Sequence, residues 1–206
     1  MLITAAEPRR QSQYEIYLDG QPAGLIDAGT WELSGYRPGG ELSREEFDAL
    51  WEASGYARAK SYALYLLGRR GYSQKELYGK ISQRYGGYAA QRAVDRMTEL
   101  GLLDDMDYAR RRAKDLIRLK HYSGDRVMLE LLRMGIEREQ AKLVLEEIEM
   151  DPAEQIRELL DRKYSRQLGD EKGRRRTIAA LQRLGYRWDE INAALRRWGA
   201  QVEFEE

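Results

Sequence analysis

An internal repeat with a period of fifty residues constrains the fold of this 206-residue chain more than any other feature. The segment "LLRMGIEREQAKLVLEEI" (131–148) aligns with "LQRLGYRWDEINAALRRW" (181–198) at that offset, and "GYSQKELYGKI" (71–81) aligns with "HYSGDRVMLEL" (121–131). Apolar residues recur in each copy at the spacing of an amphipathic helix. Repeats of this length are typical of helical arrays, in which each unit packs against its neighbours.

Capping residues and glycines divide each copy into three helices. Ser73 and Glu76 have the spacing of a capping box, in which the two residues satisfy each other's backbone N–H groups. Gly135 and Gly185 are expected in tight turns that require a positive φ. We therefore predict a mostly α fold in which tandem three-helix repeats form a curved array, with the repeats at 57–103, 104–150 and 151–206.

The first 56 residues follow a different pattern. "YEIYLDGQPAGLI" contains two short extended runs around Asp19-Gly20, a dipeptide typical of hairpin turns. The segment around Ile3 is expected to supply a third strand. Residues 1–56 are therefore predicted to form a small β-rich N-terminal cap.

A short lead-in helix is predicted at the end of this cap. Ser43 and Glu46 in "LSREEFDALW" have the spacing of a second capping box, and Phe47, Leu50 and Trp51 share one helical face. We expect this helix to end the cap near residue 56. A separate helix would then begin the first repeat.

The stretch "GLLDDMDYARRRAKD" joins the first two repeats. Leu102 and Leu103 are expected to complete the core of the first repeat, and Asp104 or Asp105 to cap the next helix. A metal site at Asp104, Asp105 and Asp107 is the alternative, but the glycine-bearing loop common in such sites is missing. Acid–base catalysis would need a partner group in a pocket, and the sequence indicates none. A structural role is therefore favoured for these aspartates.

Composition excludes several classes of protein. There is no cysteine, which excludes disulfides and thiolate metal sites. No stretch has the length and apolar character of a membrane span, and "MLITAAEPRRQ" lacks the basic-then-apolar order of a signal peptide. His121, the single histidine, is expected in an exposed turn without a second ligand. We expect a cytoplasmic protein without a membrane partner.

Charge is distributed unevenly along the chain. Residues 1–56 contain four Lys/Arg and ten Asp/Glu, whereas the whole chain contains 35 of each, so the repeats carry the excess of positive charge. Part of this charge belongs to solvated helix faces, but arginine also grips phosphate or carboxylate at two points. The residues predicted to line one partner-binding surface are Arg69, Arg70, Lys75, Lys80, Arg110, Arg111, Lys114, Arg118, Arg174, Arg175 and Arg176.

Tyrosine is abundant, with fourteen residues beside four tryptophans and two phenylalanines. We expect most to be buried or half-buried, although some could stack on bases or anchor an interface. Those considered are Tyr62, Tyr65, Tyr78, Tyr85, Tyr122 and Tyr164. The sequence contains no phosphate-binding glycine loop, dinucleotide fingerprint or serine nucleophile elbow. We therefore predict that the chain is not an enzyme and has no cofactor, metal or catalytic residue.

Several motifs together resemble the RecX family, bacterial regulators of the RecA recombinase. They are "YALYLLGRRGYSQKELYGKI", "LGLLDDMDYARRRAKDL" and "ELLRMGI". Each motif alone is a common helix-capping pattern, and the resemblance rests on their order and spacing. It is strong over about 57–149 and weaker over 150–198. The N-terminal cap is similar only to the longer members.

The resemblance implies a three-fold repeat of three-helix units that lies in the groove of a RecA filament on single-stranded DNA. It implies inhibition of ATP hydrolysis and strand exchange, and so a role in homologous recombination, DNA repair and the SOS response. The family's contact residues are not confined to these motifs, so the predicted surface rests on charge alone. We expect a monomer.

Other functions stay open on the sequence. The first alternative is a DNA-binding helical array that coats single-stranded DNA, because three-helix units resemble helix-turn-helix modules and cationic faces contact phosphates in single- or double-stranded DNA. A scaffold for another acidic protein is a further alternative, and a hydrolase is the least favoured.

Overall fold

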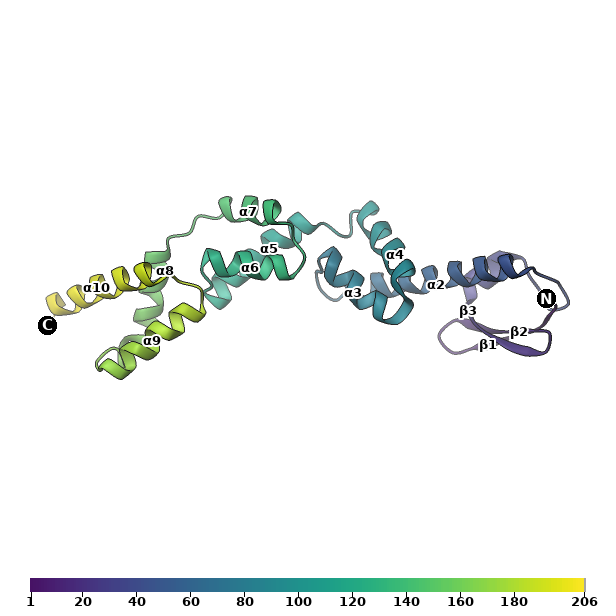
Figure 1. The fold of residues 1–206 in the computed structure, drawn as a ribbon, viewed down its shortest axis with the longest axis horizontal. Helices are drawn as coiled ribbons and strands as arrows, with labels where there is room; N and C mark the ends of the chain where they lie inside the picture. Colours follow the sequence, from purple (N-terminus) through teal and green to yellow (C-terminus); the bar gives the residue numbers. More distant parts are fainter. Residues whose placement is uncertain (206) are drawn as a thin grey trace. The chain divides into compact units, whose positions relative to one another are not determined.

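The computed structural model describes the backbone of residues 1–205 and the side chains of residues 1–199. The chain divides into two compact units, one comprising Met1–Asp104 and the other beginning at Asp105. The predicted mostly α fold with a small N-terminal sheet is confirmed (Figure 1).

The N-terminal cap is a three-stranded antiparallel sheet in the order β1-β2-β3. Its strands are β1 (Ile3–Arg9), β2 (Gln13–Leu18) and β3 (Gln21–Asp27). Asp19 and Gly20 have φ values of 50° and 78°, which fit the twist of a two-residue hairpin turn. The predicted hairpin and third strand are both confirmed. A short helix follows, α1 (Ala28–Ser34).

Helix α2 (Arg44–Leu67) runs from the cap into the first repeat without interruption. The predicted capping box is present: the Glu46 carboxylate accepts from the Ser43 N–H at 2.6 Å, and the Ser43 hydroxyl accepts from the Glu46 N–H at 3.1 Å. The prediction of two separate helices was wrong. Gly55 is the main residue in this region that disfavours a helix. A single glycine lowers helix stability by only about 1 kcal/mol relative to alanine.

The two halves of α2 belong to different cores. Near its start, Phe47 and Leu50 pack with the sheet, whereas Trp51 remains 41% exposed. Farther along, Ala59 and Ala63 are fully buried in the first repeat. Because both halves are held by burial, the helix continues across the expected boundary at 56/57. The limits of the predicted repeats themselves remain predictions.

The other helices follow the predicted order. In the first unit they are α3 (Gln74–Tyr85) and α4 (Gly87–Glu99). In the second unit they are α5 (Asp105–Lys120), α6 (Gly124–Arg133), α7 (Arg138–Glu146), α8 (Pro152–Leu159), α9 (Glu171–Arg183) and α10 (Trp188–Glu205). A π-helical turn, η1 (Leu160–Tyr164), and a 3-10 turn, η2 (Ser165–Gln167), follow α8. The sequence did not predict this change of helix type. It accompanies burial of Leu159, Leu160 and Tyr164 in one core.

Burial repeats with the fifty-residue period. Ile81, Leu131 and Leu181 occupy the same position in α3, α6 and α9, and all three are fully buried. Each lies in a different hydrophobic core, and a fourth core fills the cap. Every helical repeat therefore has apolar packing of its own, unlike a solenoid in which stacked neighbours bury one continuous core.

Gly135 and Gly185 both adopt the predicted positive φ, with values of 90° and 98°. Each follows the last turn of its helix in a Schellman motif, which satisfies carbonyls that the helix leaves open. Gly185 also lies against the start of α6. A Cβ added there would lie 2.5 Å from both the Ser123 Oγ and the Arg126 Cβ, and the Ser123 N–H donates to the Leu184 carbonyl at 3.0 Å.

The link between the first two predicted repeats differs from expectation at one residue. Leu103 is buried, but Leu102 is 50% exposed, so the prediction that both complete the core was wrong for Leu102. The Leu102 N–H donates to the Met97 carbonyl at 2.9 Å and ends α4 in another Schellman motif at Gly101. The backbone hydrogen bond therefore holds Leu102 in place while its side chain stays exposed. Helix α5 then begins at Asp105.

Candidate partner-binding surface

The predicted cationic residues of the first unit lie at the end of α2 and on α3. The Arg69 guanidinium stacks over the Tyr65 ring at 5.6 Å and donates to its hydroxyl at 2.8 Å. Tyr65 is 57% exposed, so this pair is displayed to solvent. Lys75 and Lys80 are also exposed and form no ion pair within residues 1–199.

Arg70 has several contacts within the protein. Its guanidinium lies 3.6 Å from the Tyr72 ring centroid and donates to the Gly71 carbonyl at 2.8 Å. It also lies 3.4 Å from the carboxylate of Glu76, the residue that completes the α3 capping box. These contacts tie the end of α2 to the start of α3. Arg70 therefore has a structural role in addition to the predicted one.

On α5, two of the four predicted residues are ion-paired. Arg110 donates to both carboxylate oxygens of Glu147, beyond the end of α7, at 2.8 and 3.0 Å. This bidentate hydrogen bonding lowers the pKa of Glu147, and the charge of Lys114 adds to the effect. Arg111 pairs with Asp107, one helical turn away, at 2.7 Å. Lys114 and Arg118 are exposed and form no ion pair with a described residue.

On α9, Arg174, Arg175 and Arg176 are all exposed. Arg175 pairs with Glu171 one turn earlier on the same helix. Among the described side chains, Arg174 and Arg176 have no carboxylate partner. The eleven predicted residues thus form three groups, one on each predicted repeat, and their union into one binding surface remains a prediction.

A second set of cations in the first unit was missed by the sequence reasoning. The Arg84 guanidinium lies against the rings of both Tyr62 and Tyr85, at 5.3 and 5.4 Å from their centroids. Arg92 similarly lies 4.4 Å from the Tyr56 centroid. The only local signal was Tyr88 and Arg92, which are four residues apart on α4 and in contact at 5.7 Å. The contacts of Arg84 with Tyr62 and of Arg92 with Tyr56 join different helices and have no short sequence signal. Most tyrosines are buried or half-buried, as expected, whereas Tyr65, Tyr78 and Tyr88 are exposed.

The single histidine and the acidic residues do not form a metal site among the described side chains. His121 is exposed with φ 53°, which confirms its predicted turn. Among the side chains described, no three His, Asp or Glu residues gather closely enough to hold a metal ion. None of the described helices has the length and apolarity required to cross a membrane.

Comparison with known proteins gives a match to a family model in the C-terminal part of the chain. The family model described as "RecX, third three-helix domain" matches residues 149–195. Regulatory protein RecX of Caldanaerobacter subterraneus subsp. tengcongensis is 30% identical over 167 residues, covering 79% of this chain and 84% of the relative. Its counterpart in Trichlorobacter lovleyi is 37% identical over 135 residues, covering 63% of this chain and 88% of the relative.

Solved structures share the fold. A crystal structure of regulatory protein RecX aligns with a TM-score of 0.65 at 19% identity, covering 95% of this chain and 98% of the other. The crystal structure of RecX from Lactobacillus salivarius aligns with a TM-score of 0.59 at 18% identity, covering 70% and 97%. The structural matches show a shared architecture, and the sequence matches show common descent. The chain therefore belongs to the RecX family of regulatory proteins.

Proposed function

We propose that the chain binds the RecA–single-stranded DNA filament and inhibits its ATPase and strand-exchange activities, and so restrains recombination and the DNA-damage response. The observation that carries this proposal is membership of the RecX family, whose named relatives are regulatory proteins. The exposed cations found in each predicted repeat support it. They suit a partner that presents acidic groups or phosphates along its length.

The tandem repeats give this proposal a physical basis. Each predicted repeat has its own core and displays cations, so successive repeats offer charge at successive points along a partner. Weak contacts repeated along an array add to a stable association because, once one repeat is bound, the others are held at a high effective concentration. Inhibition then follows from occupancy and needs no chemistry of the bound chain.

Direct binding to single-stranded DNA is the second candidate. Exposed Lys114, Arg118, Arg174 and Arg176 form no ion pair with a described residue and are available to phosphates. Binding of this kind releases counterions and weakens steeply as salt rises. It would also proceed without the recombinase.

Reversing the charge of Lys114 and Arg118 together should weaken binding to the RecA filament by about tenfold or more, because a favourable interfacial charge becomes a repulsive one. Neither side chain forms an ion pair with a described residue, so the fold should be retained. Reversal at Arg110 would be less informative, since it would place a second carboxylate beside Glu147. Binding is measured by fluorescence anisotropy of the preformed filament.

The matched control reverses Arg162 and Arg166, which have the same sequence spacing in the same unit, are exposed and likewise form no ion pair with a described residue. This control should bind the filament within about twofold of the wild type, because charges that lie outside an interface contribute little to its affinity. Equal loss in both double variants would mean that only net charge matters. Full binding by the Lys114/Arg118 variant would remove this face of α5 from the interface.

A further inference from the structure

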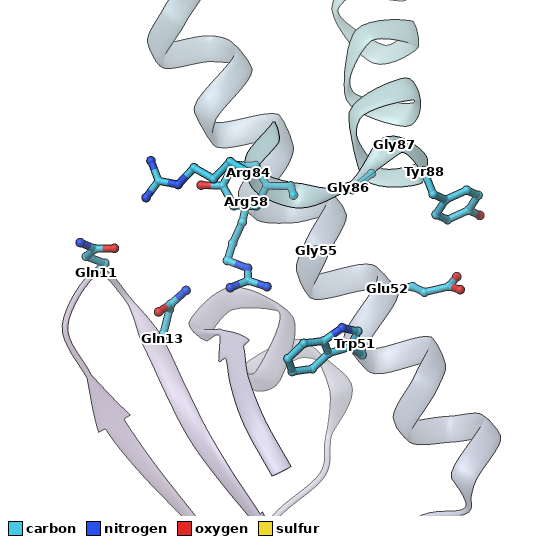
Figure 2. A pocket seen from close by; sticks show the side chains of 12 residues that line it. Gln11, Gln13, Trp51, Glu52, Gly55, Arg58, Arg84, Gly86, Gly87 and Tyr88 are labelled. Atoms are coloured by element: carbon cyan, nitrogen blue, oxygen red, sulfur yellow. The ribbon is translucent and has the colours of Figure 1, made fainter. Parts of the chain in front are cut away.

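A pocket in the first unit lies outside the predicted cationic surface (Figure 2). Its walls come from the β1–β2 turn, the middle of α2 and the junction between α3 and α4. Figure 2 shows the Arg58 guanidinium pointing from α2 toward the strand that carries Gln13, with the Arg84 and Gln11 side chains to the left of it. The Trp51 indole lies below them in that view.

The two arginines of this pocket have no carboxylate partner among the described residues. The Arg58 Nε is buried and has no acceptor there, which is a costly state for a charged donor. Stacking on Tyr62 and Tyr85 fixes the Arg84 guanidinium but leaves its N–H groups available. Glu52 also lines the pocket, but Figure 2 shows its side chain pointing away from both arginines. The two guanidiniums point to different sides of the pocket in Figure 2, and together they favour an anionic ligand.

The start of α4 reinforces this preference. The helix begins at Gly87 on the pocket wall, and no side chain caps its first N–H groups. These open donors and the positive end of the helix dipole stabilise an anion. Alone this would be a weak indication, but here it faces the same pocket as Arg58.

The remaining lining suits a flat polar group. The Trp51 indole is 41% exposed and packs closely on Gly24, where an added Cβ would lie 2.4 Å from the ring. Gln11 and Gln13 present carboxamides, which can both donate and accept hydrogen bonds. Gln11 and its neighbour Ser12 have φ values of 63° and 53°, a conformation that is unfavourable for residues other than glycine. The turn thus holds a glutamine at the pocket at a cost in backbone strain.

We infer that this pocket binds a nucleotide. The phosphate would accept hydrogen bonds from Arg58, while Arg84 and the start of α4 add favourable charge from other sides of the pocket, and the base would stack on Trp51 with its edge near Gln11 and Gln13. Base–aromatic stacking beside guanidinium groups is a common way to hold unpaired nucleotides. The nucleotide can be free or part of a single strand. The site belongs to the first unit alone and does not depend on binding to the RecA filament.

The test titrates the full-length chain with deoxythymidine monophosphate, a twelve-residue oligothymidylate, inorganic phosphate and a polyglutamate peptide, and follows the backbone amides by NMR. We expect both nucleotide probes to shift the amides of Gly87 and Tyr88. Arg58→Gln should weaken nucleotide binding by about tenfold, the effect of losing one charge-assisted hydrogen bond. Arg84→Gln should weaken it by about threefold or more, because the pocket loses a favourable charge. Arg84 is exposed, so its variant folds even if the Arg58 variant does not. Arg44→Gln is the matched control, because it removes an exposed charge from α2, the helix that carries Arg58. This variant should bind the nucleotides normally.

The probes separate the possible ligands. Oligothymidylate binding more tightly than the monophosphate assigns the site to a single strand, whereas equal affinity assigns it to a free nucleotide; both support the inference. Inorganic phosphate binding as tightly as the nucleotides would overturn it, because the base would contribute nothing. Displacement by polyglutamate at equal concentration, an equal loss in Arg44→Gln, or no amide shifts near Gly87 would also overturn it. Filament inhibition can be retained or lost in any of these cases, so the two proposals fail separately.

Discussion

Replacing Leu131 by alanine should lower the free energy of unfolding of the second unit by about 2–5 kcal/mol, the range for deleting a large side chain from a packed core. Leu131 is fully buried in α6 and packs in the core that contains Val127, Ile136 and Val144. The substitution leaves a cavity that surrounding helices fill only in part. Urea denaturation, with amide hydrogen exchange to localise the effect, measures the change.

Leu129→Ala is the matched control for this prediction. It makes the same chemical change on the same helix, but Leu129 is 50% exposed. Leu129→Ala should change the free energy of unfolding by no more than about 0.5 kcal/mol, as for other surface substitutions. Equal losses in the two variants would contradict the helical register that places Leu131 at the centre of its repeat.

Gly185→Ala should also destabilise the second unit, by about 2–5 kcal/mol in total. About 1–2 kcal/mol arises because alanine disfavours a positive φ, and the remainder, about 1–3 kcal/mol, arises from overpacking. The added Cβ would overlap Ser123 and Arg126, which form the first turn of α6. We therefore expect faster hydrogen exchange at the start of α6, more than fifty residues away in sequence.

Gly101→Ala separates these two causes. Gly101 also ends a helix in a Schellman motif with a positive φ of 67°, but an added Cβ meets no atom within 4 Å. Gly101→Ala should lower the free energy of unfolding by only about 1–2 kcal/mol, because alanine disfavours the positive φ. Hydrogen exchange in α6 should stay unchanged. A similar loss for both glycines would contradict the close contact of the Gly185 turn with α6.

Much of the fold could be predicted because local chemistry and tertiary packing agree. Asp19-Gly20 specifies a hairpin turn, and the capping boxes at Ser43 and Ser73 mark helix starts. The continuous α2 was not predicted because burial on both sides outweighs the local cost of Gly55. The π-helical turn after α8 was also missed, since it depends on how Leu160 packs in its core rather than on local sequence signals.

The candidate site was less predictable than the fold. Charge alone identifies candidate arginines; Arg174 and Arg176 are exposed, and their part in a binding surface stays a prediction. It does not reveal which arginine is neutralised by a distant carboxylate, as Arg110 is by Glu147 across 37 residues of sequence. The pocket around Arg58 likewise depends on elements brought together only by the fold, and no short motif encodes that proximity.

The most direct test of the proposed function is the effect of the chain on ATP hydrolysis by RecA on single-stranded DNA. The wild-type chain is titrated into the reaction, and binding to the same DNA without RecA is measured in parallel across a range of salt concentrations. We expect suppression of hydrolysis at well below one copy per RecA subunit, with relief in the Lys114/Arg118 double reversal. Unchanged hydrolysis together with tight, salt-sensitive binding to bare DNA would contradict the proposed function and favour the DNA-coating alternative.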